Sequence, residues 1–195
     1  MSASSLVGLP SNEPTTMITC TRRLEWDALH RIPKHESRCR AFHGHRYAAE
    51  LTCAAERLDD LGRIIDFGVI KERVGAWIDA HWDHTAILMR GDPEAEALAD
   101  ANERLGKPVY WLDGHPTAEH IVEELARVST ELLKADGVRV IAVRLWETPN
   151  CSAEWVADGL PSLPSISLPS AALPSASLPS ASLPSASLPP SNSDS

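Results

Sequence analysis

Residues 39–56 read CRAFHGHRYAAELTCAAE, and this stretch combines a clear strand pattern with a group of chemically reactive side chains. Small or apolar residues recur at every second position after His45, which predicts a strand over 45–56 with one apolar face. That face would carry Tyr47, Ala49, Leu51 and Cys53. The stretch therefore predicts both a strand of the core and a group of side chains next to it that can take part in chemistry.

Two histidines open the stretch and point to a metal site. His43 and His45 stand two residues apart, so in an extended chain both rings project from the same face. Gly44 between them allows the backbone to pass close to the site. His30, at the end of the preceding predicted strand, is the natural candidate for a third ligand. Three neutral imidazoles with an open fourth position describe a catalytic zinc site, although solvated loop histidines explain the spacing equally well.

Three further places carry side chains that could move protons or hold a ligand. Cys39 lies between two arginines, which favour its thiolate and make it a candidate acid, base or nucleophile. Asp83 precedes His84 and could orient its imidazole for proton transfer. Glu147 ends an apolar strand and could accept hydrogen bonds from a planar, guanidine-like ring edge. Taken singly, a small buried thiol, a chance pair and an exposed strand end are the simpler interpretations.

The rest of the periodicity outlines an α+β domain. Strands are predicted over 16–27, 45–56, 138–146 and 151–157, and helices over 67–81 and from Thr117 to residue 135. In the first helix, helical spacing is kept by Phe67, Ile70, Val74, Trp77 and His81. The buried stripe of the second would consist of Ile121, Leu125, Val128 and Leu132, and one face of the third strand would carry Val138, Val140 and Ala142. Residues 82–116 look irregular, with room for a short helix over 94–105. Hairpins flanking two helices favour an antiparallel sheet with the helices on one face over a doubly wound sheet.

Composition separates the ends of the chain from this domain. Residues 160–195 hold 8 of the 15 prolines, 13 serines and a single charged residue, Asp194, in repeated Leu-Pro-Ser units. Such a segment cannot form a helix or a core, so we expect a disordered tail over 159–195. Residues 1–15 are expected to be flexible as well. One domain remains, over 16–158.

Charge and cysteine usage exclude several classes of protein. The net charge of −9, without a basic stripe, is unfavourable for binding nucleic acid. No apolar run approaches the length of a membrane span, and we expect no signal peptide. Four widely spaced cysteines without a C-x-x-C pair fit reduced thiols in the cytoplasm better than a disulfide framework.

The reactive segments, taken together and in order, resemble the 6-pyruvoyl-tetrahydropterin synthase superfamily over roughly residues 17–157. The segments that carry the resemblance are Ala28-Leu-His-Arg31, Cys39-Arg-Ala-Phe-His-Gly-His-Arg-Tyr47, Ile65-Asp-Phe67, Asp83-His84, Pro116-Thr-Ala-Glu119 and Trp146-Glu-Thr148. The resemblance implies a tunnelling fold, in which each subunit contributes a four-stranded antiparallel sheet and two helices. Subunits would form a β-barrel, commonly a homohexamer made of two trimers, with active sites between subunits.

The resemblance also implies a role for each matching residue. His30, His43 and His45 would bind Zn²⁺, and Cys39, Asp83 and His84 would transfer protons. Glu147 would anchor the pterin ring of the substrate, and Thr117 with its neighbours would line that pocket. The implied substrate is 7,8-dihydroneopterin triphosphate.

The chain could belong to either of two branches of the superfamily. The short spacing from Cys39 to His43 and the segment Ile65-Asp66-Phe67 resemble the 6-carboxy-5,6,7,8-tetrahydropterin synthases of queuosine and 7-deazapurine biosynthesis. These lyases release acetaldehyde and triphosphate. The alternatives are a 6-pyruvoyl-tetrahydropterin synthase, which only eliminates triphosphate, and a non-catalytic zinc-binding interaction module. The long connection over 85–115 and the proline-rich tail depart from the family pattern.

Overall fold

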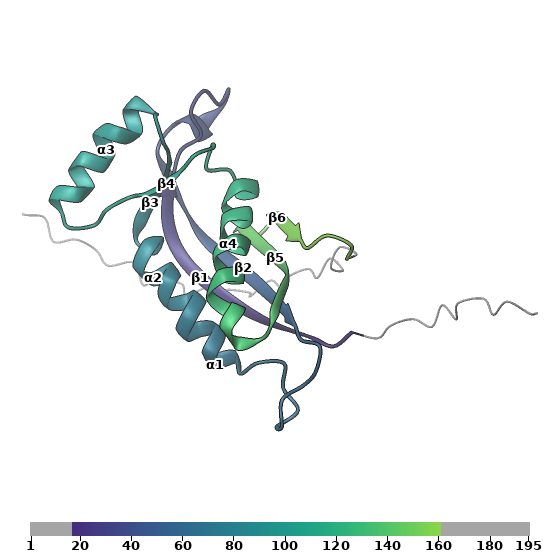
Figure 1. Cartoon of the computed structure of the whole chain (residues 1–195). Helices are drawn as coiled ribbons and strands as arrows, with labels where there is room; N and C mark the ends of the chain where they lie inside the picture. Colours follow the sequence, from purple (N-terminus) through teal and green to yellow (C-terminus); the bar gives the residue numbers. More distant parts are fainter. Residues whose placement is uncertain (1–16, 161–195) are drawn as a thin grey trace, which may run out of the picture. The chain divides into compact units, whose positions relative to one another are not determined.

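A computed structural model of the chain describes residues 17–160, which belong to one compact unit (Figure 1). Residues 1–16 and 161–195 lie outside the described residues. The expected flexible N-terminus and nearly all of the expected tail fall in these two segments, so both stay predictions.

A mixed sheet of six strands forms the frame of the domain, in the order β4-β3-β1-β2-β5-β6. Its strands are β1 (Thr19–His30), β2 (His43–Ala54), β3 (Thr85–Met89), β4 (Tyr110–Leu112), β5 (Arg139–Thr148) and β6 (Cys151–Val156). Neighbours among β1, β2, β5 and β6 are antiparallel, as predicted. The α+β class is therefore confirmed.

The prediction of four strands was wrong, because the connection over 82–116 holds two more. β3 pairs with β1 and β4 pairs with β3, both in parallel, so the sheet is not purely antiparallel. β3 is a run of five residues, four of them buried, which lacks the alternation of a half-buried strand, and β4 has only three residues. Patterns this short do not distinguish strand from helix or loop.

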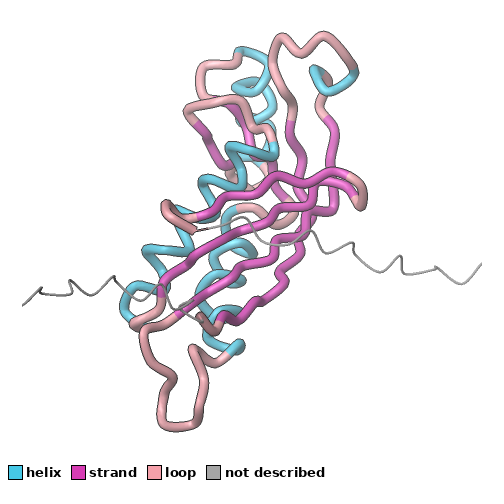
Figure 2. The backbone as a smooth tube through the Cα atoms, turned by 90° about the vertical axis from the view of Figure 1, so that its right-hand side faces the viewer, coloured by secondary structure: helices cyan, strands magenta, loops and turns pink. Residues whose placement is uncertain are grey.

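Helices cover one face of the sheet. The predicted helix over 67–81 is confirmed as α1 (Phe67–Ile70), a π turn (Lys71–Gly75) and α2 (Ala76–His81), and the second predicted helix is α4 (Ala118–Leu133). Figure 1 shows these helices in front of the strands, and Figure 2, turned by 90° about the vertical axis, shows the helices and the strands as two layers. The third helix, α3 (Pro93–Arg104), matches the short helix allowed over 94–105 and lies apart, beside β3 and β4.

The core lies between this face and the helices. The predicted face of β2 is confirmed, because Tyr47, Ala49, Leu51 and Cys53 are at most 1% exposed. On the first helix the buried residues are Ile70, Val74, Gly75 and Ile78, whereas Phe67 is 47% exposed and His81 is exposed as well. The π turn adds a residue to that turn and rotates the stripe, so that the predicted spacing holds only in part. On α4 the predicted positions 121, 125 and 128 are buried.

A β-bulge in β5 changes which of its residues face the helices. The pairing with β2 passes from Cys53 with Val140 to Thr52 with Ala142, and one residue of β5 is left over. The core face therefore runs through Val138 and Val140 and continues at Val143 and Leu145. The predicted place of Ala142 on that face was wrong, because an extra residue inverts the alternation beyond it. The same inversion places Glu147 on the helix-covered face.

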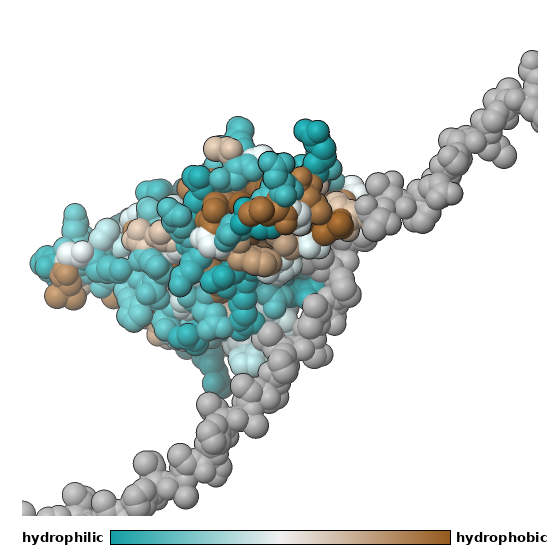
Figure 3. Space-filling model, turned by 90° about the horizontal axis from the view of Figure 1, so that it is seen from below, coloured by the Kyte–Doolittle hydropathy of each residue, from teal (hydrophilic) through white to brown (hydrophobic). Residues whose placement is uncertain are grey.

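The face of the domain seen from below is mostly polar. Hydrophilic side chains cover most of this view, and hydrophobic ones gather in one larger patch with smaller groups elsewhere (Figure 3). No helix within residues 17–160 is long and apolar enough to cross a membrane.

Candidate active site

The register of the β1–β2 hairpin brings the three histidines together. His30 lies directly opposite His43, and His45 is two residues further along β2 on the same face. Their ring centroids lie 4.4 Å (His30 and His43), 5.1 Å (His30 and His45) and 5.0 Å (His43 and His45) apart. One ring nitrogen from each lies within 4.8 Å of the others.

Hydrogen bonds orient two of these rings toward a common point. Nδ1 of His30 lies 2.8 Å from the carbonyl of Pro116, and Nδ1 of His43 lies 2.9 Å from that of Ala41. Carbonyl oxygens only accept, so each Nδ1 carries the proton and each Nε2 keeps its lone pair. The two Nε2 atoms nevertheless face one another at 3.1 Å.

A shared cation explains this arrangement of lone pairs. Two nitrogens bound to one tetrahedral zinc at about 2.0–2.1 Å lie roughly 3.3 Å apart. Carbonyl partners that fix the far nitrogen of a histidine are typical of metal sites. Burial also lowers the pKa of His30 to about 4, which keeps the imidazole neutral and able to bind a metal. The residues therefore fit a Zn²⁺ ion.

Glu147 joins the histidine cluster through the β5 bulge. Its Oε1 lies 3.6 Å from Nε2 of His30 and 3.9 Å from Nε2 of His45. The side chain is partly exposed, so a ligand can approach the carboxylate. The carboxylate predicted to hold a ring edge thus lies beside the candidate metal ligands.

The segment before α4 connects this cluster to the helix. The Pro116 carbonyl orients His30, and Thr117 forms the N-cap of α4 by accepting a hydrogen bond from the backbone N–H of His120. Thr117 therefore follows the residue that positions a candidate zinc ligand. Its predicted place in the ligand pocket stays a prediction.

The ring of Tyr47 packs against the rings of His30 and His45. This contact was not predicted from the sequence. The Tyr47 ring lies 6.0 Å from that of His30 and 5.7 Å from that of His45, and it stacks on Trp26. Its hydroxyl is buried without a hydrogen-bond partner among the described residues. The spacing of Tyr47 two residues after His45 is a signal that could have identified it.

Cys39 lies in the loop that joins the two histidine-bearing strands. It occupies a 3₁₀ turn (Arg38–Arg40), and its carbonyl accepts a hydrogen bond of 2.8 Å from Ile32. Its thiol is partly exposed and has no hydrogen-bond partner within residues 17–160. The thiol is therefore accessible for reaction.

Asp83 and His84 form a hydrogen-bonded pair at the edge of β1. Nδ1 of His84 lies 2.7 Å from Oδ2 of Asp83, and the His84 side chain is 75% exposed. Two backbone contacts fix the pair: the N–H of Asp27 donates to Asp83, and the N–H of His84 donates to the Asp27 carbonyl. His84 adopts a left-handed φ of 55°, which is uncommon for a residue with a side chain. Burial tends to raise the pKa of Asp83, but hydrogen bonds from Asp27 and His84 lower it overall.

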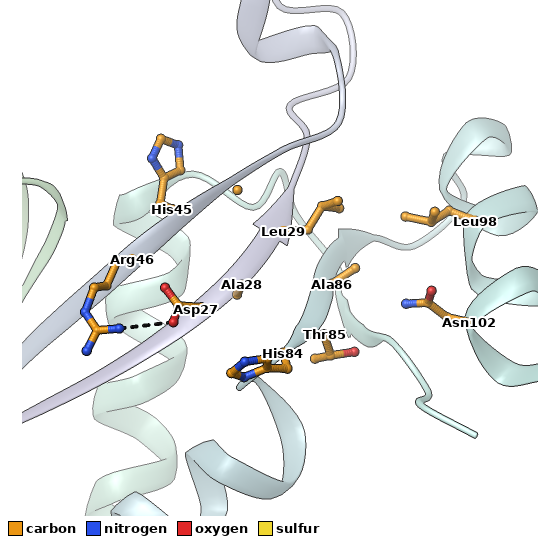
Figure 4. A pocket seen from close by; sticks show the side chains of 11 residues that line it. Asp27, Ala28, Leu29, His45, Arg46, His84, Thr85, Ala86, Leu98 and Asn102 are labelled. Carbon is orange, nitrogen blue, oxygen red and sulfur yellow. Dashed lines mark hydrogen bonds and ion pairs between the residues drawn. The ribbon is translucent and has the colours of Figure 1, made fainter. Parts of the chain in front are cut away.

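The proton-transfer candidates do not meet within one copy of the chain. His84 lines a cavity of about 510 Å³, whose lining also includes Asp27, Leu29, Gly44, Arg46, Leu98 and Asn102. His45 and Ala28 also border the cavity. Asp27, Leu29 and Arg46 alternate with the candidate ligands along β1 and β2, so their side chains project from the opposite face of the sheet. Figure 4 shows the His45 ring pointing away from Asp27, Arg46 and His84. Among the described residues, no hydrogen bond or ion pair joins His84 to Cys39 or to the histidines.

Comparison with known proteins shows which sequences the chain is similar to. Residues 19–158 match the profile of the 6-pyruvoyl tetrahydropterin synthase family. A 6-carboxy-5,6,7,8-tetrahydropterin synthase from Rickettsia bellii is 42% identical over 139 residues, which cover 71% of this chain and 99% of that protein. A protein from Halobacterium salinarum described as a probable 6-carboxy-5,6,7,8-tetrahydropterin synthase is 31% identical over 143 residues, or 73% of this chain and 89% of that one.

Solved structures of low sequence identity share the fold. An uncharacterised protein from Wolinella succinogenes superposes with a TM-score of 0.63 at 20% identity, covering 73% of this chain and 99% of that one. The 6-pyruvoyl tetrahydropterin synthase of Caenorhabditis elegans gives a TM-score of 0.51 at 17% identity, with 73% and 96% covered. The match over residues 19–158 and the identity to the Rickettsia bellii protein lead to one conclusion: the chain belongs to the 6-pyruvoyl tetrahydropterin synthase family.

Proposed function

We propose that the chain is a zinc-dependent 6-carboxy-5,6,7,8-tetrahydropterin synthase. It would convert 7,8-dihydroneopterin triphosphate to 6-carboxytetrahydropterin, releasing acetaldehyde and triphosphate. The main support for the metal is the pair of Nε2 lone pairs of His30 and His43, which face each other at 3.1 Å while both Nδ1 atoms are engaged. The main support for the 6-carboxy reaction is the 42% identity to the Rickettsia bellii 6-carboxy-5,6,7,8-tetrahydropterin synthase. The family consists of enzymes, so the chain is an enzyme, a lyase.

The residues have separable roles in the proposed reaction. His30, His43 and His45 would hold the zinc, which when bound supplies Lewis-acid polarisation of the substrate's side-chain oxygens. Glu147 would accept hydrogen bonds from the ring N–H groups and so fix the ring relative to the cluster. Thr117 and its neighbours would line the pocket around that ring.

Proton transfer would be divided between Cys39 and His84. Cys39, with an accessible thiol, would accept a proton from the side chain of the substrate. Because Asp83 holds Nδ1 of His84, the exposed Nε2 is the atom that can take up or release a second proton. A non-catalytic zinc-binding module would need neither group.

We further propose that a second copy of the chain completes each site. Within one copy, no hydrogen bond or ion pair among the described residues joins His84 to Cys39 or to the histidine cluster, and a neighbouring copy would bring its own Asp83 and His84 to Cys39. A hydrophobic patch on an otherwise hydrophilic view of the surface is consistent with a protein contact (Figure 3). The proposed assembly is a homohexamer made of two trimers.

The cytoplasm is the proposed location of the enzyme. Cys20, Cys39, Cys53 and Cys151 are all free. Unpaired thiols persist in a reducing compartment.

The product formed from dihydroneopterin triphosphate tests the proposed reaction. Full-length protein loaded with zinc is incubated with this substrate, and the pterin product is identified by mass spectrometry. A 6-carboxy product with one equivalent of acetaldehyde is the expected result. A pyruvoyl product would establish the 6-pyruvoyl synthase instead, and an unconsumed substrate would leave only the zinc-binding module.

The C-terminal repeat is expected to be dispensable for catalysis. The candidate site is built entirely from residues 30–147, so deleting residues 160–195 should leave zinc content and turnover unchanged. Elemental analysis and the product assay, applied to the full and shortened chains side by side, measure both. A loss of either property on deletion would show that the domain extends beyond residue 158.

A further inference from the structure

The loop that joins β1 to β2 carries Cys39, and it begins and ends beside candidate zinc ligands. It spans residues 31–42, between His30 and His43, which are register partners at the end of the hairpin. Within the loop, the N–H of Ile32 donates a hydrogen bond of 2.8 Å to the carbonyl of Cys39. The position of the Cys39 backbone therefore depends on the residues where the loop leaves the hairpin.

Arg31 and Phe42 form the neck of this loop. They are the first residues beyond the paired strands, because Arg31 follows His30 and Phe42 precedes His43. The guanidinium carbon of Arg31 lies over the Phe42 ring, 5.3 Å from its centroid. A cation over the face of an aromatic ring is attracted to it. This contact therefore joins the two sides of the loop at its base.

A carboxylate from outside the hairpin fixes the Arg31 side chain. Nε of Arg31 lies 3.2 Å from Oδ2 of Asp92, and Nη1 lies 3.4 Å from Oε2 of Glu94. The Asp92 side chain is 2% exposed, whereas that of Glu94 is 64% exposed. The Nε and Oδ2 atoms are buried without a hydrogen-bond partner in the described part of the chain, so their charges compensate each other. Asp92 is therefore the partner on which Arg31 depends most.

Asp92 is itself fixed by the long connection between β3 and β4. It is the N-cap residue of α3, and its carbonyl accepts a hydrogen bond of 3.0 Å from the N–H of Glu96. Further along α3, Ala95 is fully buried in a small cluster with Ala86 and Leu88 of β3. The carboxylate is thus presented by a packed helix, which holds a side chain more precisely than a free loop does.

We propose that Asp92 is a positioning residue for Cys39: it fixes Arg31, and Arg31 keeps the neck of the loop in the conformation that places the thiol for proton transfer. The connection over 85–115, which departs from the family pattern, thereby has a role in the reaction. Asp92 acts through another residue and does not touch the substrate. The inference rests on the proposed role of Cys39, but the conformation of the loop can be measured without turnover.

A small displacement of the loop is sufficient for a large effect on the rate. A misplacement of about 1 Å caused by a mutation far from the chemistry can cost roughly 100-fold. Without a buried partner, the guanidinium of Arg31 would turn toward solvent, because an unpaired buried charge is costly. The contact with Phe42 would be lost at the same time, and the neck of the loop would open.

Asp92→Asn tests this series of contacts, because the amide keeps the shape of the carboxyl group and removes its charge. In the zinc-loaded full-length protein, kcat should fall about 10–100-fold while KM changes by less than about twofold. Backbone hydrogen exchange over residues 31–42, followed by mass spectrometry, should become about tenfold faster, since the hydrogen bond from Ile32 to Cys39 opens more often. Exchange over residues 45–54 of β2 should stay unchanged, and circular dichroism verifies folding.

Glu94→Gln is the matched control. It removes a carboxylate that also faces Arg31, but from an exposed side chain. Exposed ion pairs contribute little, so kcat and loop exchange should stay within about twofold of wild type. Equal losses in Glu94→Gln and Asp92→Asn would overturn the assignment to Asp92, as would an Asp92→Asn protein with unchanged loop exchange or unchanged kcat. A wild-type protein that does not consume the pterin triphosphate would instead overturn the proposed function, whereas faster loop exchange in Asp92→Asn would still support the hold of Asp92 on the loop.

A second pair of variants keeps the test decisive if an unpaired Arg31 prevents folding. Arg31→Met removes the cation but keeps an unbranched side chain, and Arg31→Met combined with Asp92→Asn leaves no unpaired charge in the interior. If Asp92 acts through Arg31, the double variant should match Arg31→Met in kcat and in loop exchange, both being impaired relative to wild type. A further fall in kcat of about tenfold in the double variant would show that Asp92 acts by another route and would contradict the proposal.

Discussion

His43→Ala is expected to remove zinc from the protein and abolish turnover. His43 supplies one of three nitrogens that lie within 4.8 Å of one another, and its Nε2 faces that of His30 at 3.1 Å. Loss of an outer partner of a metal ligand already costs about 10–100-fold in affinity, so loss of a ligand itself should cost more. Metal content measured by elemental analysis after dialysis should fall from one equivalent per chain to near zero.

His35 provides the matched control for this experiment. It lies in the same β1–β2 connection but bonds to the backbone and hydroxyl of Ser37, away from the cluster. His35→Ala should therefore retain both zinc and activity. A His43→Ala protein that keeps a full equivalent of zinc would refute the ligand assignment, even if its activity were lost.

The sequence was sufficient for those parts of the fold that depend on regular alternation. The face of β2 through Tyr47, Ala49, Leu51 and Cys53 and the two long helices follow from local period alone, and the structure confirms them. The convergence of His30 on His43 needs one additional fact, the register of a single hairpin. Local pattern and one antiparallel pairing therefore account for most of the metal cluster.

Irregular and long-range features could not be predicted in the same way. The β5 bulge leaves no local signature in the alternating run VRVIAVRLW, yet it decides that Glu147 faces the histidines and Arg144 does not. The position of Asp83 and His84 depends on the backbone of Asp27, 56 residues before Asp83. Neither feature produces a periodic pattern in the sequence, because both depend on contacts between strands that are far apart in the chain.

Mixing two inactive variants is expected to restore activity if sites form between copies. Cys39→Ala and His84→Ala should each reduce turnover by about 10²–10⁴-fold, the usual contribution of a general acid or base, while zinc content stays unchanged. When the two chains are co-expressed with different affinity tags and purified as mixed assemblies, some sites combine Cys39 of one chain with His84 of the other. Equal random mixing would make about a quarter of the sites intact.

The recovered activity distinguishes the two arrangements of the site. Among the described residues, no hydrogen bond or ion pair joins His84 to Cys39, and the exposed His84 ring lines a cavity whose lining does not include Cys39. Activity of the mixed assemblies near a quarter of wild type is therefore the expected outcome. Mixed assemblies that remain as inactive as either parent would show that Cys39 and His84 act within the same chain.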